Sequence, residues 1–177
     1  ELSNLINRTT EATKTAIRTC NPTPSIEEAH LPSIDEFVLY VILRSYATVP
    51  ELIMCLIYLS WFQERLPPGS FIMRPSTPHR VFLAALMMAH KVYNDNSVNN
   101  TCWAECSAFP ECGFAGFSNV EVNLIEKEFL SFLDWEVHIS PDLCPGLVSV
   151  VFASMGMQTL HRDCGTASPA YHRATPM

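Results

Sequence analysis

The sequence predicts an all-α domain, and three observations carry this prediction. Capping boxes begin at Ser33, Thr48 and Ser118, each with a glutamate three residues later. In such a box the hydroxyl and the glutamate satisfy backbone N–H groups that the first helical turn leaves unpaired. Nine consecutive apolar residues, Val81–Ala89, consist mainly of helix-forming Ala, Leu and Met. No segment gives a convincing strand pattern, although Val148–Phe152 leaves that alternative open.

The N-terminal part, residues 1–32, is predicted to be an amphipathic helix followed by a linker. Apolar residues recur at near-helical spacing from Leu2 to Ile17, with polar residues between them. The segment from Cys20 to Pro32 contains three prolines and ends the helix. We expect this helix to lie on the core of the domain.

Two buried helices follow, one from Ser33 to about Ala47 and one from Thr48 to Phe62. The second has Pro50 in its first turn, where a missing N–H costs little, and it ends before Pro67-Pro68-Gly69. The central helix comes next, from His79 to Asp95. Because its middle is apolar on every side, it must be surrounded by other helices.

The remainder of the chain is predicted to hold one clear helix and a tail. A short helix could begin at Cys102–Ala104, but prolines and glycines punctuate the segment up to Phe117. The third capping box opens an amphipathic helix that we expect to reach about His138. Beyond residue 140, Leu147–Met157 is a possible short helix, and Thr159–Met177 is predicted to be disordered.

Composition limits the classes of protein. The net charge of −7 with only eleven Lys and Arg argues against a nucleic-acid partner. No secretory signal precedes Ile17, and no apolar run is long enough to span a membrane. We therefore expect a nuclear or cytoplasmic protein that is not secreted, with seven reduced cysteines and no stable homo-oligomer.

Two charges stand where a helical wheel favours apolar residues. With Val122 at 0° and about 100° per residue, Phe129, Leu133 and Val137 fall between about 340° and 60°, and Glu126 falls near 40° among them. A lone buried carboxylate is costly, so Glu126 must lie at the rim or have a partner. Lys91, near the end of the central helix, interrupts a stripe of Ala and Met. A lysine there also simply complements the helix dipole, and apolar arcs with single charges also describe protein-binding surfaces.

Four stretches in this order resemble the cyclin box, most closely that of the fungal Pcl-type cyclins, which activate a phosphate-responsive cyclin-dependent kinase. They are SIDEFVLYVILRSY, TVPELIMCLIYLSWF, HRVFLAALMMAHKVYND and VNLIEKEFLSFLDWEV. The resemblance implies a single box of five helices over residues 33–140, packed around a buried third helix, His79–Asp95. Residues 141–177 then form a C-terminal extension.

The resemblance also implies a function and a set of contact residues. A cyclin performs no chemistry itself, so the chain would be a regulatory subunit with no cofactor, controlling phosphate-response or cell-cycle signalling. In the family, a Lys near the end of the third helix and a Glu in the fifth bind the kinase beside its regulatory αC helix. The matching residues and their apolar neighbours are Met88, Lys91, Val92, Glu126, Leu130 and Val137.

Several features depart from the family, and three alternatives stay open. Trp61 stands where relatives usually carry Arg, Val92 replaces a commoner aromatic residue, and residues 107–117 form a longer segment than usual. A metal site would use Cys102, Cys106 and Cys112 with His90 or His138, although the spacing is unlike common zinc patterns. An enzyme would need a catalytic motif that the sequence lacks. A cyclin-like helical scaffold for a non-kinase partner is the third alternative.

Overall fold

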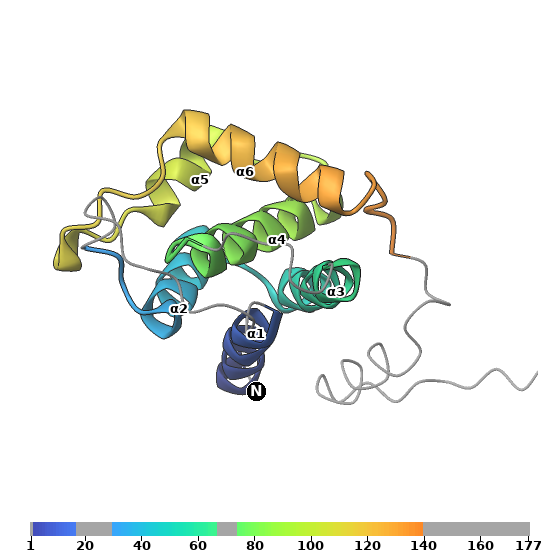
Figure 1. The fold of residues 1–177 in the computed structure, drawn as a ribbon, viewed down its shortest axis with the longest axis horizontal. Helices are drawn as coiled ribbons and strands as arrows, with labels where there is room; N and C mark the ends of the chain where they lie inside the picture. Colours follow the sequence, from blue (N-terminus) through green and yellow to red (C-terminus); the bar gives the residue numbers. More distant parts are fainter. Residues whose placement is uncertain (1, 17–29, 67–73, 140–177) are drawn as a thin grey trace, which may run out of the picture. The chain divides into compact units, whose positions relative to one another are not determined.

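The computed structural model describes residues 2–16, 30–66 and 74–139, and within them the chain is helical (Figure 1). No strand occurs in these ranges, where the only β pairing is an isolated bridge between Phe109 and Phe114. The all-α prediction is therefore confirmed. The helices are α1 (Leu2–Ala16), α2 (Ile34–Ser45), α3 (Val49–Arg65), α4 (Thr77–Tyr93), α5 (Asn100–Ser107) and α6 (Asn119–Phe132), with a 3₁₀ turn at Pro110–Cys112.

Helix α4 lies at the centre of the described bundle. It packs against α1, α2, α3 and α6, and Figure 1 shows it between α6 and the lower helices. Every residue from Val81 to Ala89 is buried. The middle of α4 therefore has no face toward solvent, as its unbroken apolar run predicts.

The three predicted capping boxes are all present and set the starts of α2, α3 and α6. In each box the glutamate side chain accepts a hydrogen bond from the backbone N–H of the Ser or Thr three residues before it. These contacts fix where three of the four long helices of the box begin. The positions of the buried stripes follow from those starts.

Helix α1 packs on α3, α2 and α4, but its buried side differs from the predicted one. Leu5 is buried as expected, whereas Leu2 is 44% exposed and Thr9, Thr10 and Thr13 are buried. Each threonine hydroxyl donates to the carbonyl oxygen four residues earlier, at 2.8 to 3.0 Å. Because these hydroxyls are satisfied within the helix, burying them against the neighbouring helices costs little.

Helix α6 is shorter than predicted, because it ends at Phe132 rather than near His138. Of the residues that the wheel placed in one apolar arc, Val122, Phe129 and Leu133 are buried and Val137 is half-buried. After Leu133 the chain enters left-handed conformations, with φ of 53° at Asp134 and 62° at Trp135. The apolar spacing continues through this turn to Val137, so the periodicity alone did not reveal where the helix stops.

The segment between α5 and α6 is folded onto α2. The Arg44 side chain donates to the Ala108 carbonyl at 3.1 Å, and the Tyr40 and Phe109 rings meet edge to face. Gly116 has φ of 83°, and a Cβ there would lie 2.6 Å from the Ala108 backbone nitrogen. Only glycine allows this close approach. The longer 107–117 segment therefore has a defined conformation and packs against α2.

The described residues all belong to one compact unit within residues 1–140. The possible helix 147–157 and the predicted disordered tail lie outside the described residues.

Candidate protein-binding site

Lys91 and Glu126 form an ion pair that joins α4 to α6. The Lys91 Nζ lies 2.6 Å from Glu126 Oε1, and the two side chains are 24% and 19% exposed. Asn100, at the start of α5, accepts from Lys91 at 2.7 Å and donates to Glu126 Oε2 at 2.5 Å. Both carboxylate oxygens are therefore bonded, which explains how an acid occupies an apolar arc.

The pair retains capacity for an external partner. An ammonium group has three N–H donors, and two are used by Glu126 and Asn100. A carboxylate offers about four lone-pair sites, and two of those on Glu126 are used. The pair is thus rigidly held, partly accessible and still able to donate and accept one or more hydrogen bonds.

A second polar network supports the C-terminal end of α4 from α3. Glu51 is buried, and its Oε1 lies 2.6 Å from His90 Nδ1 and 2.7 Å from the Asn94 amide nitrogen. Burial acts to raise the pKa of the Glu51 carboxyl. Hydrogen bonds from the Thr48 backbone and hydroxyl, from Asn94 and from His90 outweigh it and hold that pKa below its ordinary value. This network orients the turn of α4 that carries Lys91.

The other predicted contact residues differ in how far they reach solvent. Val92 is 42% exposed and lies beside Lys91. Leu130, one turn after Glu126, is half-buried, and so is Val137, whose carbonyl accepts a 2.6 Å hydrogen bond from the Tyr58 hydroxyl. Met88 is only 3% exposed. It packs beneath the surface that the sequence led us to expect it to form.

Trp135 was not singled out from the sequence, although it lies between Leu130 and Val137 along the chain. It is 63% exposed, and its backbone N–H donates to the Leu130 carbonyl at 2.9 Å. Two consecutive left-handed residues hold it outside the core. On the wheel, Trp135 falls near 220°, in the polar arc, assuming about 100° per residue. A tryptophan in the polar arc of the wheel is the sequence feature that could have indicated an exposed aromatic contact residue.

The alternative of a metal site gains no support from the arrangement of the thiols. Among residues 2–16, 30–66 and 74–139, no three His, Cys, Asp or Glu side chains lie close enough to hold a metal ion. Cys102, Cys106 and Cys112 are free, and the Cys112 thiol contacts the His30 and Phe109 carbonyls. In the same ranges, no helix is both long and apolar enough to cross a membrane.

The chain belongs to the cyclin family, because the family's sequence profile, described as "Cyclin", matches residues 3–137. Cyclins are regulatory subunits rather than enzymes. The matched region runs from α1 to the turn after α6 and includes the Lys91 and Glu126 pair. The family that the four sequence stretches indicated is therefore confirmed.

Among curated proteins, the chain is similar to three cyclins of Saccharomyces cerevisiae. It is 32% identical to PHO85 cyclin-2 over 76% of this chain and 42% of that protein. It is 32% identical to PHO85 cyclin-9 over 69% and 38%, and 30% identical to PHO85 cyclin-1 over 78% and 50%. The chain thus spans half or less of the length of these relatives. No solved structure matches it.

Proposed function

We propose that this chain binds and activates a cyclin-dependent kinase through a contact face around Lys91 and Glu126. The face consists of Lys91, Val92, Glu126, Leu130, Trp135 and Val137. The observation that carries the proposal is the Lys91–Glu126 pair, a partly exposed ion pair within apolar surroundings in a member of the cyclin family. Met88 is buried, so it is left out of the face.

The face has the composition of a protein interface. Apolar side chains surround a few charges, and those charges already satisfy each other. Covering a paired lysine and glutamate costs less than covering either alone, because neither is left as an unpaired buried charge. The remaining N–H of Lys91 can then donate to a backbone carbonyl of the partner.

Binding would act on the kinase by shifting a conformational equilibrium. A protein kinase is active when the Glu of its αC helix pairs with the Lys of strand β3, and the position of αC controls that pair. A rigid surface that binds only the inward position of αC raises the population of the active state. The residues of this chain thereby contribute binding energy and no chemistry.

The names of the relatives supply a candidate kinase. Three of them are named as PHO85 cyclins, so we propose a PHO85-like kinase as partner and phosphate-response or cell-cycle signalling as the process. We expect the complex in the nucleus or cytoplasm. The alternative of a cyclin-like scaffold for a non-kinase partner predicts no activation of any such kinase.

A paired substitution tests the proposal. Lys91→Ala/Glu126→Ala should weaken binding to a PHO85-like kinase by roughly 100-fold, since residues at the centre of an interface carry most of the affinity. Kinase activity should fall in parallel. Titration calorimetry and a peptide-phosphorylation assay, with and without the chain, measure the two effects.

The matched control is another lysine–carboxylate pair between helices, Lys14 and Asp35, which lie 2.7 Å apart on α1 and α2. Lys14→Ala/Asp35→Ala removes a similar pair away from the face and should bind the kinase normally. Equal affinities of both double variants, each verified as folded by circular dichroism, would refute the assignment of the face.

A further inference from the structure

A groove on the other side of α6 has no role in the proposed kinase contact. It has a volume of about 680 Å³ and lies between α3, α4 and α6. On the α6 wheel, Glu126 and Leu130 fall near 40° and 80°, whereas the groove residues Leu124 and Glu128 fall near 200° and 240°, taking about 100° per residue. Within α6, Glu126 and Leu130 of the kinase face therefore lie on a different side from Leu124 and Glu128 of the groove; Trp135 follows the end of the helix at Phe132, so the wheel does not place it.

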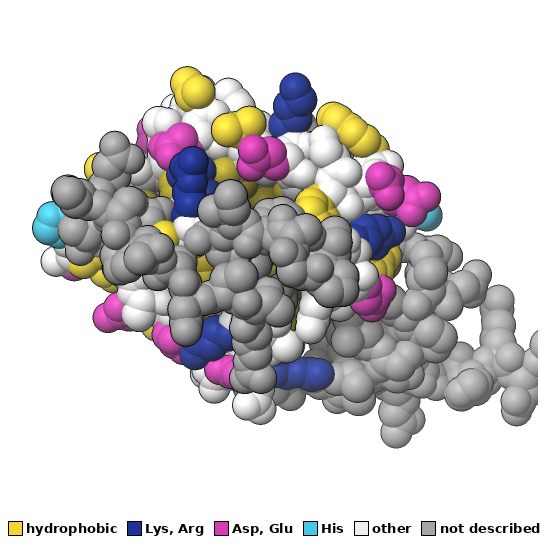
Figure 2. Space-filling model, in the orientation of Figure 1, with side chains coloured by type: hydrophobic (Ala, Val, Ile, Leu, Met, Phe, Trp, Pro, Cys, Tyr) yellow, Lys and Arg dark blue, Asp and Glu magenta, His cyan; other side chains and the backbone are white. Residues whose placement is uncertain are grey.

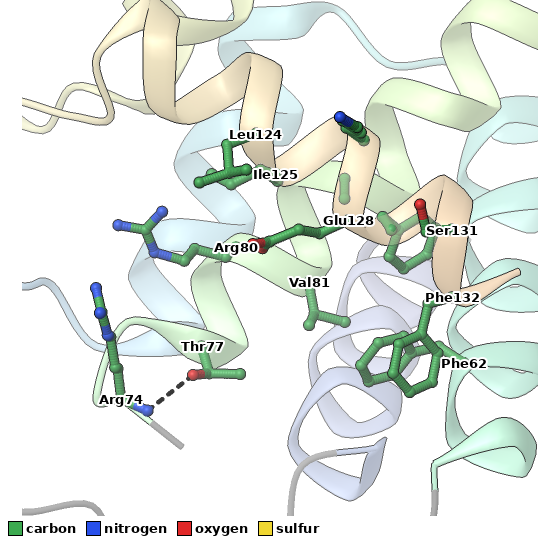
Figure 3. A pocket seen from close by; sticks show the side chains of 13 residues that line it. Phe62, Arg74, Thr77, Arg80, Val81, Leu124, Ile125, Glu128, Ser131 and Phe132 are labelled. Carbon is green, nitrogen blue, oxygen red and sulfur yellow. Dashed lines mark hydrogen bonds between the residues drawn. The ribbon is translucent and has the colours of Figure 1, made fainter. Parts of the chain in front are cut away.

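The groove has two chemically distinct ends (Figure 3). Phe62 and Phe132 lie at one end, with ring centroids 4.6 Å apart, and Phe62 also stacks on Phe129 at 5.7 Å. Arg74 and Arg80 lie at the other end. An occupant that matches both ends needs a bulky apolar group and a negative charge.

The rim is positive, although the chain as a whole is strongly acidic. Arg74, Arg80 and Lys127 line the groove together with one acid, Glu128. Arg80 is paired with Glu121 at 2.7 Å and lies over the Phe117 ring. Neither Arg74 nor Lys127 has a side-chain ion pair or hydrogen bond within the part of the chain that the structure describes. Two cations are thus available to a ligand in a chain with a net charge of −7.

Apolar surface reaches solvent beside these cations. Leu124 is 51% exposed and projects over the groove from α6. Figure 2 shows hydrophobic, basic and acidic side chains interspersed over this part of the surface. An exposed apolar edge next to free cations is typical of a surface that binds another molecule.

We propose that this groove docks an acidic peptide segment of a partner protein, with a bulky apolar side chain at the phenylalanine end and Asp or Glu side chains at the Arg74 and Lys127 rim. Charge complementarity favours an acidic peptide over a basic one, because a basic segment would be repelled by two unpaired cations. The apolar anchor supplies affinity, and the acidic residues fix its orientation. The proposal does not depend on kinase binding.

The test uses the full chain and a phage-displayed library of random peptides. Selected peptides should combine Phe, Leu or Trp with several Asp or Glu. Synthetic copies should bind Lys127→Glu and Leu124→Ser about tenfold more weakly than the original chain, measured by fluorescence anisotropy. Arg8→Glu, an equal charge change at an exposed position of α1, should bind them normally.

Several results would overturn the proposal. These are the selection of no peptide, the selection of basic peptides, or equal affinity of Lys127→Glu and Arg8→Glu. Arg74→Glu provides a second variant if Lys127→Glu lowers the melting temperature. Dimerisation that Lys127→Glu abolishes, seen by sedimentation, would assign the groove to a second copy instead. Lys91→Ala/Glu126→Ala should retain peptide binding, which separates this proposal from the kinase face.

Discussion

At the scale of single residues, Trp135 combines strain with exposure. Its φ of 62° and that of Asp134, 53°, each cost about 1 to 3 kcal/mol in a residue other than glycine. Trp135→Gly should therefore raise the free energy of unfolding by about 1 kcal/mol yet weaken kinase binding. Asp134→Gly is the matched control, because it relieves the neighbouring strain and keeps the aromatic ring. Urea unfolding and calorimetric titration measure the two effects, and equal kinase affinity of both glycine variants would remove Trp135 from the contact face.

Ionisation of Glu51 should affect the stability of the chain at acidic pH. Its pKa is lowered in the folded chain from an ordinary value of 4.5. Since the folded-state pKa is depressed, its contribution is complete above that ordinary value and is lost as pH falls through the folded value. Glu51→Gln should destabilise the chain at neutral pH and approach the original chain in acid. Urea unfolding at several pH values measures this, and a difference independent of pH would contradict it.

At the scale of helices, the middle of α4 stabilises the bundle, whereas we expect its C-terminal end to contact the kinase. Leu83 is fully buried, whereas Val92 is 42% exposed on the same helix. Leu83→Asp should cost more than about 4 kcal/mol and unfold the domain, because it buries an unpaired charge. Val92→Asp should leave the melting temperature nearly unchanged and weaken kinase binding. Thermal unfolding of both variants, followed by circular dichroism, tests this. If Val92→Asp is unfolded, the C-terminal end of α4 is also needed for the fold.

Helices also show what the sequence could and could not reveal. The starts of α2, α3 and α6 were predictable, because each depends on a local pair of side chains three residues apart. The end of α6 was not, because Leu133 and Val137 keep the helical spacing through a left-handed turn. The wheel identified Glu126 as an anomaly, but its bond to Asn100 depends on how α5 packs. Such contacts between distant segments are set by tertiary packing, which local patterns do not encode.

At the scale of the whole molecule, α1 is part of the bundle rather than an appendage. It packs on three other helices and buries Leu5, Thr9 and Thr13, so it lies on the core as the sequence led us to expect. Removing residues 1–16 should therefore uncover apolar surface of α3. We expect a loss of about 3 to 5 kcal/mol, which lowers the melting temperature of a chain of this size by roughly 10 °C.

A point substitution distinguishes the effect of losing the packing of α1 from the effect of shortening the chain. Leu5→Asp keeps α1 but places a charge in its buried face, so it should lower the melting temperature in the same direction as the deletion. Leu2→Asp, at a position 44% exposed, is the control and should have little effect. Differential scanning calorimetry compares the four chains. If the chain without residues 1–16 has the same melting temperature as the original chain, the packing of α1 on the other helices does not stabilise the domain.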